Sequence, residues 1–212
     1  NRALAHILKV EGDIVQAASH LAGRTTFATE FPAGAFGNAI RTACQIIANP
    51  SGVAVVRVTL SGFDTHANQA SPTGALTGNL RQLDAGLAAL RDGLVPSGAW
   101  NRTVIVVATE FGREVAVNGT LGTDHGTGAA AFVLGGAVNG GRVHAEWPGL
   151  AKRDRNDGRD LKITTDLRAV LRSVLADHLR LASRALDNDV FPGSGALRHV
   201  AHGTYVDVGA QD

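Results

Sequence analysis

The sequence is 212 residues long, and its 20 basic and 19 acidic side chains leave a formal net charge of +1. A chain of this length can bury the core of one domain, and its 44% hydrophobic and 18% charged residues are typical of a globular protein with little charge. The balanced charge argues against a nucleic-acid-binding or membrane-surface protein, because both need clustered positive charge. The longest apolar runs are too short to span a bilayer.

Two features of the composition bear on how the chain is made. The single cysteine, Cys44, excludes an internal disulfide and is expected to be buried on a helix face. The sequence has no methionine and opens with NRALAH. We therefore expect a processed chain, a fragment or the ordered part of a longer one, and no signal peptide can be read in it.

Hydrophobic periodicity predicts the first elements in chain order. A broken apolar stripe predicts a helix over residues 3–22, and a clearer stripe predicts one over 34–48. The apolar run at 53–60 is nearly continuous, which is typical of a strand buried on both faces of a parallel sheet. The most regular helical pattern covers residues 79–95.

Two further strands are predicted downstream. Residues 103–109, TVIVVAT, follow a strand and a helix, so the order predicts a right-handed βαβ crossover with 53–60 and 103–109 as parallel neighbours. Residues 129–134 form the next apolar run, and no crossover helix precedes it, so we expect this third strand to be antiparallel to the second. Its start then lies at the sheet edge where the other two strands end.

The end of the chain predicts one more helix. It runs from Asp166 to Arg184 with Thr165 as its cap, and residues 187–212 are expected to form a surface tail. There are no internal repeats. We predict a single α/β domain over residues 1–212, a three-layer α/β/α sandwich with a mostly parallel sheet.

Acid and imidazole side chains follow the first predicted strand. Asp64 and His66 are separated only by Thr65, and ligands of open α/β sheets bind at the edge where the strands end. Carboxylate oxygen and imidazole nitrogen suit divalent ions such as zinc or manganese. The alternative is that Asp64 caps the following segment and that His66 is an ordinary loop histidine.

A second acidic residue follows the strand at 103–109. Glu110 is a candidate metal ligand or general base, and Arg113 is a candidate catalytic residue that holds an anionic group bidentately. The alternative is a structural ion pair between these two side chains.

The sharpest motif is GTDHG at residues 122–126. Its glycines let the backbone turn tightly while Asp124 and His125 project together; the alternative is an ordinary Asp-containing turn. If residues 129–134 are antiparallel as predicted, this pair joins the other acids, and convergence favours a metal-dependent hydrolase site. The expected metal ligands are Asp64, His66, Glu110, Asp124 and His125.

The nearby hydroxyl groups do not form a recognisable nucleophile site. Ser61, Thr65 and Thr109 lie in neither a nucleophile elbow nor a helix N-terminus. We therefore expect part of the catalytic machinery to lie outside this chain.

Several motifs in order resemble the carboxy-terminal half of the domain-of-unknown-function family 1501. They are GFDTHANQ, LDAGLAALRDGL, TVIVVATEFGR, GTDHGTGAAAFVLGGAVNGG and GRDLKITTDLRAV. The resemblance implies a place in the alkaline phosphatase-like superfamily, with the sulfatases and the cofactor-independent phosphoglycerate mutases. In that superfamily Asp and His from strand ends hold two metal ions beside a Ser or Thr nucleophile.

The resemblance also implies roles for single residues. Asp64 and His66 look like the Asp and His of one metal, Glu110 stands where an acid follows a strand, and His125 looks like the His before a late strand. The implied activity is hydrolysis of a small phosphate or sulfate ester with one or two divalent ions, with Thr65 and Arg113 at the substrate. Twin-arginine export would place the protein in the periplasm or outside the cell. The rival interpretation is a non-catalytic binding or accessory protein with a degenerate metal site.

Overall fold

A computed structural model describes three stretches of the chain, residues 25–49, 52–69 and 72–200. The chain separates into two compact units: unit 1 comprises residues 1–61 and 78–100, and unit 2 comprises residues 62–77 and 101–212. The helix predicted over 3–22 lies outside the described residues. That the whole chain is one domain stays a prediction.

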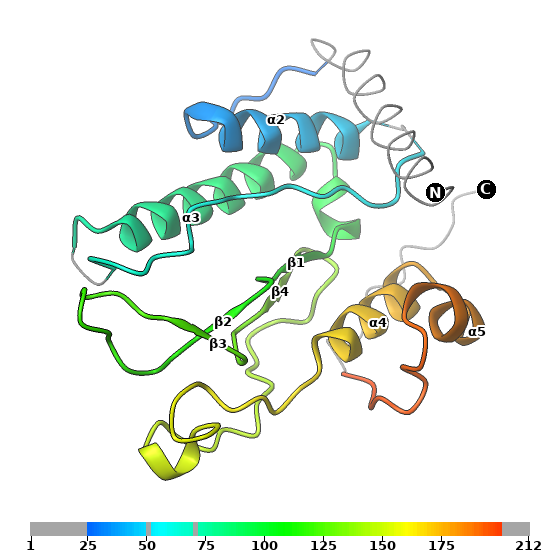
Figure 1. Cartoon of the computed structure of the whole chain (residues 1–212). Helices are drawn as coiled ribbons and strands as arrows, with labels where there is room; N and C mark the ends of the chain where they lie inside the picture. Colours follow the sequence, from blue (N-terminus) through cyan, green and yellow to red (C-terminus); the bar gives the residue numbers. More distant parts are fainter. Residues whose placement is uncertain (1–24, 50–51, 70–71, 201–212) are drawn as a thin grey trace, which may run out of the picture. The chain divides into compact units, whose positions relative to one another are not determined.

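Unit 1 contains helix α2 (Gly34–Ala48) and most of helix α3 (Ala75–Leu94), which lie side by side (Figure 1). The helix predicted over 34–48 is confirmed. The helix predicted over 79–95 is also present, but it begins four residues earlier, at Ala75. The periodicity of apolar residues was thus a sufficient signal for both helices, whose apolar faces pack together.

Small residues let α2 and α3 approach closely. The ring of Phe36 lies where a side chain at Gly86 would stand, and Cys44 Sγ is 3.0 Å from the position that a Cβ would take at Gly93. Cys44 is buried, as predicted, and its thiol contacts the carbonyl oxygen of Leu90 at 3.8 Å. Burial raises the pKa of this thiol to about 12, so Cys44 is an inert core residue.

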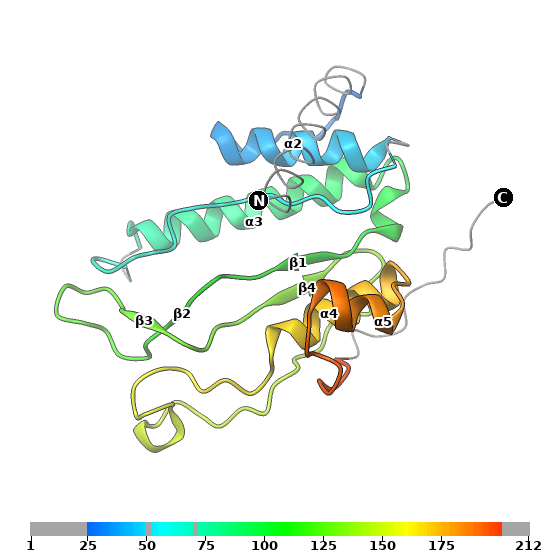
Figure 2. The ribbon, with the colours of Figure 1, turned by 45° about the vertical axis from the view of Figure 1, so that its right-hand side comes forward.

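Unit 2 contains two antiparallel strand pairs (Figure 2). Strand β1 (Ile105–Val107) pairs with β4 (Phe132–Leu134), and β2 (Gly112–Arg113) pairs with β3 (His125–Gly126). The antiparallel arrangement predicted for residues 129–134 is therefore confirmed, and the end of β1 lies opposite the start of β4. Strands β2 and β3 were not predicted, because two-residue strands leave no periodic pattern in the sequence.

The strand predicted over 53–60 is wrong. All of these residues are described, and none lies in a helix or strand. Val55 is 61% exposed, so the run is not buried on both faces. A strand exists only with a hydrogen-bonded neighbour, and the described partner of β1 is β4. The predicted parallel crossover is therefore not found among the described strands.

The last part of unit 2 is helical. Helix α4 (Leu167–His178) ends six residues before the predicted boundary, and its N-cap is Asp166 rather than the predicted Thr165. The Asp166 carboxylate accepts a hydrogen bond from the backbone N–H of Arg168. This is the hydrogen bond that defines an N-cap residue. The remaining helical segments of the described residues are Ala99–Arg102, Lys152–Asp154, α5 (Ser183–Ala185) and Leu186–Val190.

The described strands form only two-stranded antiparallel sheets. They neither show nor exclude a larger sandwich, so the three-layer α/β/α fold with a mostly parallel sheet stays a prediction. Within the described residues, no helix combines the length and the apolar character that crossing a membrane would require.

Candidate metal centre

Loops of unit 2 bring a carboxylate and two imidazoles to one point. His66 Nε2 is 2.9 Å from Asp64 Oδ1, and His125 Nε2 is 2.6 Å from the same oxygen. The three ligand-type atoms all lie within 4.8 Å of one another. We call Asp64, His66 and His125 the triad. Their side chains are about half exposed, so solvent and small solutes can reach the site.

Glycines hold the triad loops close together. A Cβ at Gly122 would lie 2.1 Å from the backbone of His66, and one at Gly126 would lie 2.7 Å from the backbone of Arg113. Among the described residues, those with positive φ include neither of these glycines. The glycines of GTDHG therefore permit close approach of two backbones, and not the tight turn that we predicted.

Asp124 contacts the triad through the second ring nitrogen of His66. Its Oδ1 lies 2.9 Å from His66 Nδ1, so the imidazole stands between two carboxylates, with Nε2 toward Asp64 and Nδ1 toward Asp124. In metal sites a carboxylate on the second ring nitrogen fixes the tautomer and the orientation of a ligating histidine. The geometry favours this positioning role for Asp124 over the direct ligation expected from the sequence.

Asn118 supports the same imidazole, and the sequence analysis missed it. Its Nδ2 donates to Asp124 Oδ1 at 3.1 Å and to the backbone oxygen of His66 at 3.0 Å. Its Oδ1 accepts from the backbone N–H of Gly122 at 2.9 Å. The Asn118–Gly119 dipeptide is a turn signal, but nothing in it indicates a contact with a residue more than fifty positions away.

Arg113 connects the loops of the triad. Its Nη1 donates to the backbone oxygen of Thr123 at 2.6 Å, and its Nη2 donates to the backbone oxygen of Phe63 at 2.6 Å and to Asp64 Oδ1 at 2.9 Å. Three of its five N–H groups are used in this way, which leaves two for an anion. Its ion pair with Asp64 takes the place of the Glu110–Arg113 pair considered from the sequence.

Glu110 lies outside the triad. It is exposed in the bend before β2, and the structure records no hydrogen bond or ion pair between it and the other described residues. Among the described residues, the side chains close enough to share a metal ion are those of Asp64, His66 and His125. The structure therefore does not bring Glu110 together with them, and its role as ligand or base stays a prediction.

The local charges keep both aspartates of the site ionised. A hydrogen bond with His125 holds the pKa of Asp64 below its ordinary value, and His66 and Arg113 lower it further. Hydrogen bonds from His66 and Asn118 likewise lower the pKa of Asp124. Because metal ligands must be deprotonated, both carboxylates are in the form that attracts a cation at neutral pH.

The donor set of the triad fits a divalent transition metal. One carboxylate oxygen and two imidazole nitrogens match sites in which three protein ligands leave one position open. Metal–ligand distances of about 2.0–2.2 Å place tetrahedral neighbours roughly 3.3 Å apart, whereas Asp64 lies 2.6 and 2.9 Å from the two imidazoles. Half-exposed side chains can separate by that small amount to hold an ion.

Hydroxyl groups near the triad are already engaged. Thr65 is buried, and its Oγ1 lies 2.8 Å from Gln69 Oε1. Thr109 Oγ1 donates to the backbone oxygen of Phe111 at 2.6 Å. Both hydroxyls donate to amide or carbonyl oxygens, which are too weakly basic to activate a nucleophile. The contact of Thr65 with a substrate stays a prediction.

A buried carboxylate anchors the segment that follows the triad. Asp160 is 0% exposed, and its Oδ2 accepts from the backbone N–H of Thr127 at 2.7 Å and from its hydroxyl at 2.5 Å. These hydrogen bonds lower the pKa of Asp160 to about 2. Since Thr127 lies two residues after His125, Asp160 helps to hold that imidazole in place. Nothing local in the sequence indicates the burial of Asp160.

Comparison with known proteins identifies a family. The model of the family described as "Protein of unknown function (DUF1501)" matches residues 2–191, which is most of the chain. The search of curated proteins and the search of solved structures found no match. The family expected from the motifs is therefore confirmed, and its match extends beyond the motifs that indicated it.

Proposed function

Because the chain belongs to the DUF1501 family and carries an open Asp–His–His triad, we propose that it is a metal-dependent hydrolase of phosphate or sulfate esters. The observation that carries the proposal is the convergence of Asp64, His66 and His125, whose ligand-type atoms lie within 4.8 Å of one another. Asp64 and His125 are 61 positions apart in the sequence. Metal sites are usually built by such a convergence of distant residues.

Each residue around the triad has a chemical part in this proposal. A divalent ion at the triad would supply Lewis acidity to the ester oxygen and to water. Asp124 would hold His66 with its Nε2 toward the ion. The two remaining N–H groups of Arg113 would donate to the anionic group of the ester, which is the interaction that guanidinium groups make best.

The wider assignment rests on the resemblance of the motifs. It supports a place in the alkaline phosphatase-like superfamily, the three-layer sandwich, and a periplasmic or extracellular location. The ligands of a second ion and the nucleophile would come from an N-terminal segment or another chain. The triad alone accounts for one ion.

Metal binding and turnover test the proposal together. We expect this chain, loaded with zinc or manganese and dialysed, to retain one equivalent of metal by elemental analysis. Together with the segment or chain that supplies the nucleophile, it should hydrolyse 4-nitrophenyl phosphate or sulfate. Asp64→Asn should weaken metal binding at least ~100-fold, because it removes the charged ligand on which both imidazoles converge. Asp157→Asn, which removes a carboxylate from an exposed loop position, is the matched control. Equal metal affinity in Asp64→Asn and the control would contradict the proposal.

A second candidate function is a non-catalytic binding or accessory protein that retains a degenerate metal site. The observation that favours it is the engagement of the Thr65 and Thr109 hydroxyls in internal hydrogen bonds. This candidate predicts stoichiometric metal without turnover of either ester. If neither metal nor chelator changes the thermal stability, both candidates fail, and the triad is a structural cluster.

A further inference from the structure

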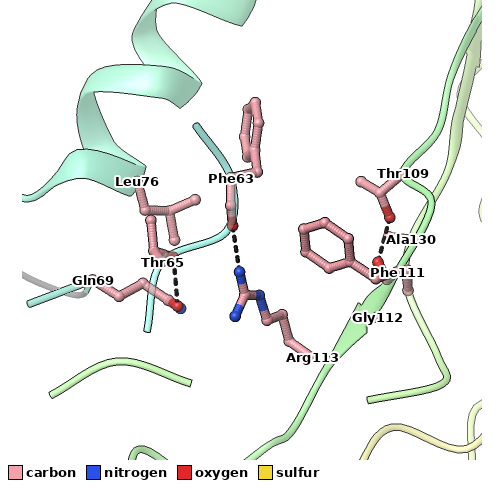
Figure 3. A pocket seen from close by; sticks show the side chains of 10 residues that line it. Phe63, Thr65, Gln69, Leu76, Thr109, Phe111, Gly112, Arg113 and Ala130 are labelled. Atoms are coloured by element: carbon pink, nitrogen blue, oxygen red, sulfur yellow. Dashed lines mark hydrogen bonds between the residues drawn. The ribbon is translucent and has the colours of Figure 1, made fainter. Parts of the chain in front are cut away.

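A small open pocket of about 150 Å³ lies in unit 2 beside the triad. Carbon forms most of its surface, contributed by Phe63, Leu76, Phe111, Ala129 and Ala130. Figure 3 shows the Arg113 guanidinium beneath Phe63 and beside the ring of Phe111. We call this the apolar pocket.

The hydroxyl groups in the lining of the apolar pocket are already paired, and Arg113, which also lines it, has two N–H groups left for the anionic end. Gln69 Oε1 lies 2.8 Å from the hydroxyls of both Thr65 and Thr123. The Thr109 hydroxyl donates to the backbone oxygen of Phe111. A polar ligand would have to break these hydrogen bonds to form its own, and exchanging one hydrogen bond for another contributes little binding free energy. The pocket therefore suits an apolar group.

Two lining residues connect the apolar pocket to the triad. The Phe111 ring stacks on the His125 imidazole, with centroids 4.6 Å apart and planes 6° apart. Arg113 donates to Asp64 Oδ1 and also lies over the Phe111 ring, 5.0 Å from its centroid. A small molecule whose anionic end lies at the triad and Arg113 thus has the apolar pocket within reach of its other end.

We propose that the apolar pocket receives a phenyl-sized group of the ester, which makes aryl esters the substrate class of this site. Apolar cavities of about 150 Å³ hold benzene, and aromatic walls such as Phe63 and Phe111 favour a ring over a chain by edge and offset contacts. This inference rests on the proposed function, because the triad is the place assigned to the anionic end.

Two non-hydrolysable ligands test the inference on wild-type protein. With the metal-loaded protein, isothermal titration calorimetry should show phenylphosphonate binding about tenfold more tightly than methylphosphonate, since covering roughly 55 Å² of apolar surface is worth such a factor. Equal affinities with metal bound would overturn the apolar pocket as a subsite and leave the metal centre standing. This comparison needs no variant.

A filled pocket gives the matched variant test. Ala130→Leu places a larger side chain in the lining and should reduce the preference for phenylphosphonate to within about twofold. Ala131→Leu adds the same volume at the next, exposed position, which is not in the lining, and should keep the preference. Loss of the preference in both variants, or in neither, contradicts the inference.

A metal-free measurement separates failure of this inference from failure of the proposed function. In the presence of a chelator, fluorobenzene should bind the wild-type protein and Ala131→Leu, but not Ala130→Leu, by ¹⁹F NMR. If the protein holds no metal but fluorobenzene binds in this pattern, the hydrolase proposal fails and the pocket's preference for a ring stands. If fluorobenzene binds no variant, the pocket assignment is wrong whatever the metal does.

Discussion

The α2–α3 pair of unit 1 and the triad of unit 2 are held in place by different forces. The helices are joined by buried apolar side chains such as Leu94, which is 0% exposed, and by glycines that allow close packing. The triad is about half exposed and is held by hydrogen bonds from Arg113 and Asn118 to backbone and carboxylate oxygens. The stability of the helical pair depends on how well buried side chains fill the space between the helices, whereas the geometry of the triad depends on hydrogen bonds made by single polar atoms.

This difference explains how the triad can remain open. Strands β1 to β4 contain only two or three residues each, so the loops of the site are joined by scattered backbone hydrogen bonds, such as that from Gln69 N–H to the Leu121 oxygen at 2.8 Å, and not by long ladders. Side chains that reach backbone carbonyls, such as Arg113, add to these bonds. Solvent access to Asp64 is thereby retained, as a site for a cation and an anionic ester requires.

The largest expected effect is on the helical pair. Leu94→Ala should lower the free energy of unfolding by about 2–5 kcal/mol, because it leaves a cavity in a fully buried position. Leu80→Ala, in the same helix but 50% exposed, should cost about 1 kcal/mol or less. Urea denaturation measures both. Similar losses in the two variants would show that burial in α3 does not determine the stability of unit 1.

Asp160 provides the next test, because its contribution should depend on pH. Its folded pKa of about 2 lies below the unfolded value of about 3.9, so the stabilisation is complete above that value and disappears as the pH falls toward 2. Asp160→Asn should lower Tm on the order of 5 °C at pH 7, and the gap from wild type should close between pH 4 and 2. Calorimetry with a chelator present measures this, with Asp157→Asn as control. A gap independent of pH would mean that the charge of Asp160 is not what Thr127 requires.

The smallest expected effect concerns Asp124, where structure and sequence give different roles. As a positioning residue, Asp124 should be replaceable by Asn with about a tenfold loss of metal affinity, far less than the loss in Asp64→Asn. Competition with a chromogenic chelator measures both. The Co²⁺ absorption spectrum should keep its shape, because the set of ligands is unchanged. If Asp124→Asn is as severe as Asp64→Asn, Asp124 is a direct ligand, as its place in GTDHG indicated.

Local patterns in the sequence were enough for part of this description. The apolar stripe over 34–48 predicted α2, and the stripe over 79–95 predicted most of α3, because the spacing of apolar side chains reflects the face that a helix buries. The missing crossover before residues 129–134 predicted the antiparallel pairing of β1 and β4. The residue types of GFDTH and GTDHG were sufficient to nominate ligands, and the motifs were sufficient to recognise the family.

Long-range pairing was beyond those patterns. The β-branched run at 53–60 reads as a strand, but a strand exists only if a partner is present, and the partner is set by contacts far away in the chain. Glu110 and Asp124 are the same kind of side chain in sequence, yet only Asp124 lies against His66. Its role as a support depends on which imidazole nitrogen it faces. The distance between Asp124 and His66 is set where residues 65–69 meet residues 120–123, as in the bridge between Ala67 and Leu121, and no local periodicity encodes that meeting.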